Sequence, residues 1–229
     1  MKIRIKFRKY GTMKFIGHLD VMRYFQKAIR RADVDVCYSG GFSPHQIMSF
    51  AAPLGVGNTS NGEYVDIEVS STKDSETMKK CLNGVMSEGF EVVSYRGLPD
   101  DAANAMSIVG AGDYTLAFRP GYEPEDMDKE TWFQGLIAFF ERPSVMVTKK
   151  TKRGEKEMDL KPLVYELRIC PEGDGEMEGP RLFMKISAGS AANVKPEQVL
   201  DAYYGFLGKE RPPFAFMVQR EEIYADRAS

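Results

Sequence analysis

The two histidines of this 229-residue chain, His18 and His45, are the residue type suited to proton transfer near neutral pH. Brought together, they could act as general acid and base of a metal-independent ribonuclease, with Tyr38 or Lys14 assisting. Together with Asp20 they could instead bind a metal ion. His45 could also hydrogen-bond a phosphate or a base, and His18 could face a ligand or could cap or pack the helix; the sequence leaves these alternatives open.

An aromatic pair accompanies the second histidine. Tyr38 and Phe42 flank Gly40 and Gly41 in the loop YSGGFSPHQ, whose direction Pro44 helps to fix. Aromatic rings on a glycine loop beside arginines are typical of surfaces that stack bases and bind phosphates. The alternative is that the glycines only permit a tight turn.

A basic helix is predicted from His18 to Arg31, because apolar residues recur there at steps of three and four. Its expected core stripe is Leu19, Met22, Phe25, Ala28 and Ile29. The basic side chains off that stripe, Arg23, Lys27, Arg30 and Arg31, and Lys14 before the helix are candidate phosphate contacts. Asp20 either lies in the first turn, where the helix dipole favours an acid, or pairs with Arg23.

A second basic element follows later in the chain. It contains Lys149, Lys150, Lys152, Arg153 and Lys156. Such a run is either a solvated loop or an arm that grips RNA or another protein, with Asp159 and Lys161 anchoring its base.

The charge distribution supports a positive surface. Net charge is −2, yet the first 31 residues carry ten lysines and arginines against the single acid Asp20. This segregation predicts a basic face, and a charged strand edge is the alternative.

Several functional classes are disfavoured by what the sequence lacks. No apolar run reaches the roughly 18–20 residues of a membrane span, and the N-terminus has no signal-peptide pattern, so we expect a cytoplasmic protein without membrane contact. Three scattered cysteines predict neither a disulfide framework nor a thiolate metal site. Nucleotide-cofactor motifs are absent, and no cofactor is expected.

Periodicity predicts the fold class α+β. The first half is expected to contain a strand over 3–7, a helix over 18–31, strands over 47–54 and 63–70, a helix over 72–86 and a strand over 91–95. The second half is expected to contain a strand over 114–118, a helix over 128–142, a strand over 144–148, a basic hairpin, strands over 163–170 and 181–187, a helix over 196–205 and a strand over 214–222. We therefore predict tandem ferredoxin-like (βαββαβ) units with antiparallel sheets, in domains 1–99 and 105–229, the second with an inserted basic hairpin.

The N-terminal motifs resemble those of the radical-SAM-linked protein family of unknown function. The matching pattern comprises HLDxxR from His18 to Arg23, the pair Arg30-Arg31, YSxGFxPHxxxSFAxPLxxG from Tyr38 to Gly57, and ExxD at Glu63 and Asp66. Asp20, Gly40, Gly41, Pro44, Glu63, Asp66 and Asp159 are the motif positions to which we assign structural roles. The segment 148–162 is similar to the family's second block, with Lys161 in place of an arginine.

Family members stand alone or form the C-terminal part of a radical SAM protein. This chain lacks the CxxxCxxC cluster motif and is similar to the stand-alone form. The resemblance implies a separate radical SAM iron–sulfur protein as partner.

These observations lead to one main hypothesis and two alternatives. The main one is an accessory RNA-binding module, without catalysis of its own, that acts with a radical SAM protein in tRNA or rRNA modification or processing. The first alternative is an RNA-processing or RNA-modifying enzyme that uses His18 and His45. The second is a protein-interaction domain that docks a radical SAM enzyme.

Overall fold

Alternating apolar and charged residues at the N-terminus form strand β1 (Lys2–Lys9), in which Ile3, Ile5 and Phe7 are buried. The computed structural model describes residues 1–151, 154–173, 177–189 and 192–226. These residues form a mixed α/β fold with five α-helices and mostly antiparallel strand pairing. They divide into two compact units, 1–110 with the residues from Arg220 on, and 111–219.

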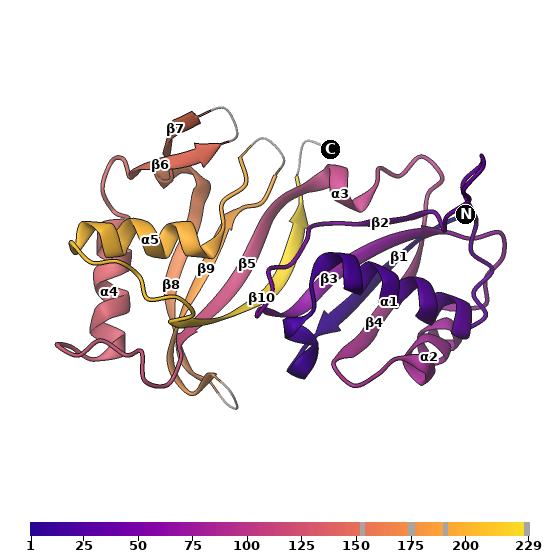
Figure 1. Cartoon of the computed structure of the whole chain (residues 1–229), viewed down its shortest axis with the longest axis horizontal. Coiled ribbons are helices and arrows are strands. Elements are labelled where there is room, and N and C mark those ends of the chain that lie inside the picture. Colours follow the sequence, from indigo (N-terminus) through magenta and orange to yellow (C-terminus); the bar gives the residue numbers. More distant parts are fainter. Residues whose placement is uncertain (152–153, 174–176, 190–191, 227–229) are drawn as a thin grey trace. The chain divides into compact units, whose positions relative to one another are not determined.

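In the first unit, two long helices pack against the strands of its sheet (Figure 1). Its elements are β1, α1 (His18–Arg31), β2 (Met48–Phe50), β3 (Thr59–Glu68), α2 (Ser75–Val85), β4 (Phe90–Leu98) and the short α3 (Ala105–Ile108). The strand order is β4-β1-β3, with β2 and the end of β10 (Phe216–Ala225) also on β3. Strand β1 runs antiparallel to both β3 and β4.

Aromatic packing holds α1 to this sheet. Phe25 of α1 is completely buried, and its ring centre lies 4.4 Å from that of Phe7, 5.6 Å from Phe50 and 5.8 Å from Phe90. Met78 and Leu82 bring α2 into the same core. Burial of each large apolar side chain contributes about 1.5–3 kcal/mol, so the position of α1 is well determined.

Two residues of the predicted α1 stripe are not buried. Leu19 is 61% exposed and Met22 is only partly buried, whereas Val21, outside the predicted stripe, is buried. The prediction for Leu19 was therefore wrong. Leu19 lies three residues before Met22, and this spacing fits the helix period as well as the spacing of the residues that are buried.

Two strand boundaries of the first unit differ from the sequence prediction by four residues, the end of β2 and the start of β3. Strand β2 ends at Phe50, because the carbonyls of Ala52 and Pro53 accept hydrogen bonds from the Arg220 side chain and not from a neighbouring strand. Strand β3 begins at Thr59 and passes through Gly62, which lies just before the predicted strand 63–70. A Cβ atom at Gly62 would lie 2.7 Å from the Glu221 carbonyl oxygen, so only glycine allows the two strands to come this close.

The second unit also combines two longer helices with antiparallel strands. It contains β5 (Val109–Phe118), α4 (Lys129–Phe139), β6 (Met146–Thr151), β7 (Gly154–Asp159), β8 (Val164–Gly173), β9 (Gly179–Ser187), α5 (Pro196–Phe206) and the start of β10. The strand order is β10-β5-β9-β8, and β6 and β7 form a separate antiparallel pair. The predicted hairpin after α4 is thus confirmed for the residues described.

Aromatic residues dominate the core of the second unit. Trp132 and Phe133 of α4 pack on Phe118 of β5, and Trp132 also contacts Tyr203 of α5. Asp128 begins α4 by accepting a hydrogen bond from the Thr131 backbone N–H over 2.9 Å. No helix in the described parts of the chain combines the length and the apolar character that crossing a bilayer requires.

The predicted domains, 1–99 and 105–229, are parts of the chain expected to fold independently. The two units of the structure are defined only by contacts among their residues. Because contacts do not show independent folding, the domain division stays a prediction.

Candidate nucleic-acid interface

The glycine-rich loop predicted to bind bases is a closed hairpin. Tyr38 and Gln46 form a β-bridge, and the Ser39 N–H donates to the His45 carbonyl over 2.8 Å. The Ser39 hydroxyl accepts from the His45 N–H and lies 2.9 Å from His45 Nδ1. This double closure fixes the shape of the loop.

The two aromatic side chains of this loop face solvent. Phe42, at its tip, is fully exposed, and Tyr38 is 52% exposed. Gly41 has a φ of +99°, a backbone conformation that favours glycine, so the turn requires a glycine at this position. Gly40 and Pro44 are exposed and complete the loop.

The base of the loop is attached to α1. Gln46 is buried, and its Nε2 donates to the backbone carbonyl of Gln26 over 3.2 Å. Gln26 lies three residues after Arg23 and four before Arg30, so these residues share one side of the helix. The base of the aromatic loop is therefore attached to the part of α1 between Arg23 and Arg30.

Four basic residues of α1 differ in what they contact. Lys27 and Arg30 are exposed, and Arg23 forms an exposed ion pair with Asp20 at 3.4 Å, one of the two roles considered for Asp20. Arg31 instead donates to the Val85 carbonyl at the end of α2. We define the basic stripe of α1 as Arg23, Lys27 and Arg30.

Lys14 lies outside this stripe, in the 3-10 helix Gly11–Phe15 before α1. Its ammonium nitrogen is 5.6 Å from the centre of the Phe15 ring, and its carbonyl accepts from the Gly57 N–H. Lys14 thus helps to hold the chain that enters α1.

A cavity of about 300 Å³ opens where the loop closes. Ser39 and His45 line it from the loop, and Ser49, Glu68 and Asn104 line it from other segments of the first unit. His45 is therefore a solvent-accessible cavity residue.

His18 has different surroundings. Its ring meets Phe50 edge-on at 5.4 Å and lines a cavity of about 10 Å³ with Lys9 and Glu63, which is too small for a nucleotide. Burial, and secondarily the charge of Lys9, lower the pKa of His18. The cavities of His18 and His45 have no lining residue in common. Catalysis by the pair stays a hypothesis.

A buried charged cluster adjoins His18. Lys9, Glu63 and Arg220 are only 2%, 5% and 4% exposed, and Arg220 pairs with Glu63 at 3.4 Å. Burial raises the pKa of Glu63, and the charge of Arg220 partly offsets this. Burial likewise lowers the pKa of Lys9, whose Nζ donates to the Ile16 carbonyl.

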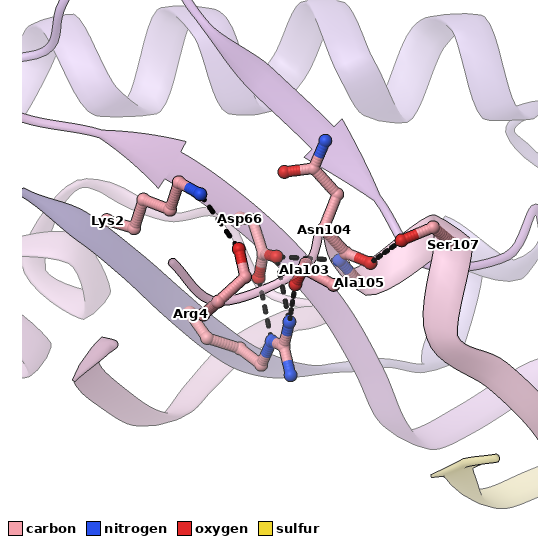
Figure 2. Close-up of polar contacts among 8 residues, drawn as sticks. Lys2, Arg4, Asp66, Ala103, Asn104, Ala105 and Ser107 are labelled. Carbon is pink, nitrogen blue, oxygen red and sulfur yellow. Dashed lines mark hydrogen bonds and ion pairs between the residues drawn. The ribbon is translucent and has the colours of Figure 1, made fainter. Parts of the chain in front are cut away.

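The second acid of the ExxD motif forms another ion pair, shown in Figure 2. Arg4 donates to both carboxylate oxygens of Asp66, over 2.8 and 2.9 Å. Asp66 also accepts from the Ala105 N–H over 2.7 Å. Both motif acids, Glu63 and Asp66, are thus paired with arginines.

The sequence reasoning missed Lys9 and Arg220, although a signal was present. Lys9 continues the inward series Ile3, Ile5, Phe7 of β1. Arg220 continues the inward series Phe216, Val218 of β10 in the same way. A charged residue at an inward position of a strand indicates a buried ion pair.

The second basic element is only partly described. Lys152 and Arg153 lie outside the described residues, and the backbone of Lys150 pairs with Glu155 in the β6–β7 hairpin. Lys161 donates to the Phe140 carbonyl, and Asp159 accepts from the N–H groups of Val145 and Lys161 over 2.8 and 3.0 Å. These two residues anchor the hairpin.

Metal ligation was the remaining chemical possibility for the histidines. Within the described residues, no three or more His, Cys, Asp and Glu side chains are grouped so as to hold a metal ion.

The fold and these surfaces define a mixed α/β protein with an exposed aromatic loop and a basic helix. The chain belongs to DUF2344, a family described as an uncharacterized protein conserved in bacteria, whose model matches residues 2–196. No curated protein matches the sequence. The family description states no activity and no partner, so association with a radical SAM protein stays a prediction.

Proposed function

We propose that this chain is an accessory module that binds tRNA or rRNA and acts with a radical SAM iron–sulfur protein. The observation that carries the RNA-binding part is the attachment of the Phe42 loop to the basic helix through Gln46 and Gln26. The association with a radical SAM protein rests on the sequence resemblance.

The loop and the helix would supply complementary parts of the binding energy. A base stacked on an aromatic ring contributes about 1–3 kcal/mol, independent of its identity. Phe42 and Tyr38 offer such rings to solvent. Arg23, Lys27 and Arg30 would pair with phosphates and release counterions.

We assign the two units to tandem ferredoxin-like folds. The order β4-β1-β3-β2 supports this for the first unit, and β10-β5-β9-β8 supports it for the second. Each unit also has two longer helices. Because such folds carry many functions, the RNA proposal depends on the surface residues and not on the fold.

Salt-dependent binding tests the proposal. Affinity for a single-stranded RNA should fall steeply between about 50 and 200 mM salt. The triple variant Arg23→Ala, Lys27→Ala, Arg30→Ala should reduce the magnitude of the log–log salt slope by about 2, since each lost phosphate contact on a single strand contributes about 0.7. Arg96→Ala, which removes an exposed arginine of β4, should leave the slope unchanged.

Two results would contradict the proposal. One is the absence of RNA binding at low salt. The other is a triple variant whose salt slope equals that of Arg96→Ala.

A groove in the second unit favours a second candidate function, docking of the radical SAM protein. The groove has a volume of about 540 Å³ and lies along β6 and α5. The guanidinium carbon of Arg142 lies 4.1 Å from the Phe206 ring centre and 5.0 Å from that of Phe139. No described residue hydrogen-bonds the Arg142 side chain, and none pairs with the outer edge of β6.

These features fit an extended segment of the partner. Such a segment could add to the free edge of β6 and place an acidic side chain on the oriented Arg142. Arg142→Ala should weaken the complex with the radical SAM protein about tenfold and leave RNA binding intact. Equal affinities of Arg142→Ala and the control Lys209→Ala would contradict docking at this groove.

A further inference from the structure

The cavity at the base of the aromatic loop has polar groups that no described residue uses. Ser49, Glu68 and Asn104 line it, and no described residue forms a hydrogen bond with the Ser49 hydroxyl, the Glu68 carboxylate or the Asn104 amide. Figure 2 shows the Asn104 amide directed away from the Arg4–Asp66 pair. These groups could therefore bind a ligand without breaking an existing interaction.

The loop closure orients His45 at the same cavity. Its Nδ1 is occupied by the Ser39 hydroxyl, which leaves Nε2 for a ligand. Ile47 also lines the cavity, whereas Met48 and Ile67, which complete its lining, belong to the hydrophobic core of the first unit. A volume of about 300 Å³ is at the lower end of the range for small-molecule sites, and it suits a flat heterocycle.

The charge of the lining decides which part of a nucleotide fits. Glu68 and Asp66 both contribute carboxylates, and Asp66 is already neutralised by Arg4. Lys2 is the cation of the lining, and its Nζ donates to the Ala102 carbonyl. A phosphate group would be repelled by Glu68, whereas an amino group of a base would donate to it.

We propose that this cavity binds one unpaired base that carries an exocyclic amino group, with Glu68 accepting from that amine. This inference rests on the proposed RNA function and deepens it. Asn104 and Ser49 would bind the neighbouring ring nitrogen and carbonyl groups. Uracil has no amino group and would leave the Glu68 carboxylate desolvated and unpaired, which is the costly case.

Ser39 and His45 connect the aromatic loop with the cavity. They close the loop that carries Phe42, and they line the cavity. A base in the cavity would thus have its neighbours in the strand beside the exposed rings, as in other single-strand binding surfaces where bases are unstacked one by one.

Two binding measurements test the proposal. The first titrates the protein with cytidine and with uridine and follows amide chemical shifts of the cavity residues. The second compares a short oligouridylate with the same strand carrying one central cytidine. Cytidine should be preferred about tenfold in both, the value expected for one hydrogen bond to a charged group.

Glu68→Gln and Asn104→Ala should remove most of this preference. Glu88→Gln, an exposed glutamate elsewhere in the first unit, should retain it. Thermal unfolding of each variant shows whether it is folded.

The outcomes separate this proposal from RNA binding itself. Salt-dependent binding of both strands with equal affinity would overturn the base pocket and leave the RNA function standing. Cytidine binding that Glu68→Gln abolishes, without any RNA binding, would uphold the pocket and overturn the RNA function. A preference that Glu68→Gln leaves unchanged would also overturn the pocket.

Discussion

Gln46 Nε2 donates to the backbone carbonyl of Gln26 over 3.2 Å, and this bond joins the aromatic loop to the centre of α1. The bond connects two segments that are separate in the sequence but carry the stacking and phosphate-binding groups of the proposed interface. Because Gln46 is buried, the bond is protected from water and should be stronger than an exposed equivalent.

Gln46→Ala is expected to loosen the loop. Loss of a buried hydrogen bond should reduce the free energy of unfolding by about 1–2 kcal/mol, measured by urea denaturation. RNA affinity should fall while the salt slope stays the same, since no charge is removed. Gln134→Ala removes an exposed glutamine bonded to Glu130 and should change neither quantity. Unchanged RNA affinity in Gln46→Ala would show that the attachment is not needed.

The Arg4–Asp66 pair should contribute far more to stability than the pair on α1. Asp66→Asn leaves Arg4 without its carboxylate in a largely buried setting and should cost about 3–5 kcal/mol. Asp20→Asn breaks the exposed pair with Arg23 and should cost at most about 1 kcal/mol. Urea unfolding of both variants gives the comparison. Equal effects would mean that Asp66 has no special structural role.

His18 should make the protein sensitive to mild acid. Its pKa lies below the ordinary value of 6.5, so the unfolded chain binds a proton at higher pH than the folded protein does. The unfolded state then carries more protons, and stability is lost as pH falls below about 6.5 toward the folded pKa. His18→Gln should lessen this loss, whereas His45→Gln should keep it. Urea unfolding at several pH values measures the effect.

Lys9→Met gives an independent check on the cause. It removes the charge that helps to lower the pKa of His18. The His18 ring should then titrate at higher pH in an NMR titration. A pKa that stays the same or falls would contradict a contribution from Lys9.

Local signals made the elements of this chain predictable. Helix α1 begins and ends at the predicted residues, His18 and Arg31, because Gly17 precedes it and Asp33 takes a positive φ of 54° just beyond it. The loop was predictable for the same reason, since its glycines and proline exclude both a helix and a strand.

Tertiary contacts were beyond reach of the sequence. The partner of Glu63, Arg220, lies 157 residues away, and nothing local connects the two. Gly62 lies outside the predicted strand 63–70, although it belongs to β3 and permits the close approach of Glu221. Likewise, a single sequence does not fix which side of α1 faces the sheet, and this decides that His18 packs against Phe50 and that Leu19 is exposed.

The most direct test of the central claim places a fluorescent reporter at the tip of the loop. Phe42→Trp adds an exposed tryptophan, while the one natural tryptophan, Trp132, is buried in the second unit. Stacking of RNA bases on this side chain should quench its emission, with a midpoint equal to the dissociation constant and a loss of the effect at high salt. Phe214→Trp, at an exposed position of the second unit, should show no quenching. RNA that binds to saturation without changing the emission of Phe42→Trp would contradict the proposed interface.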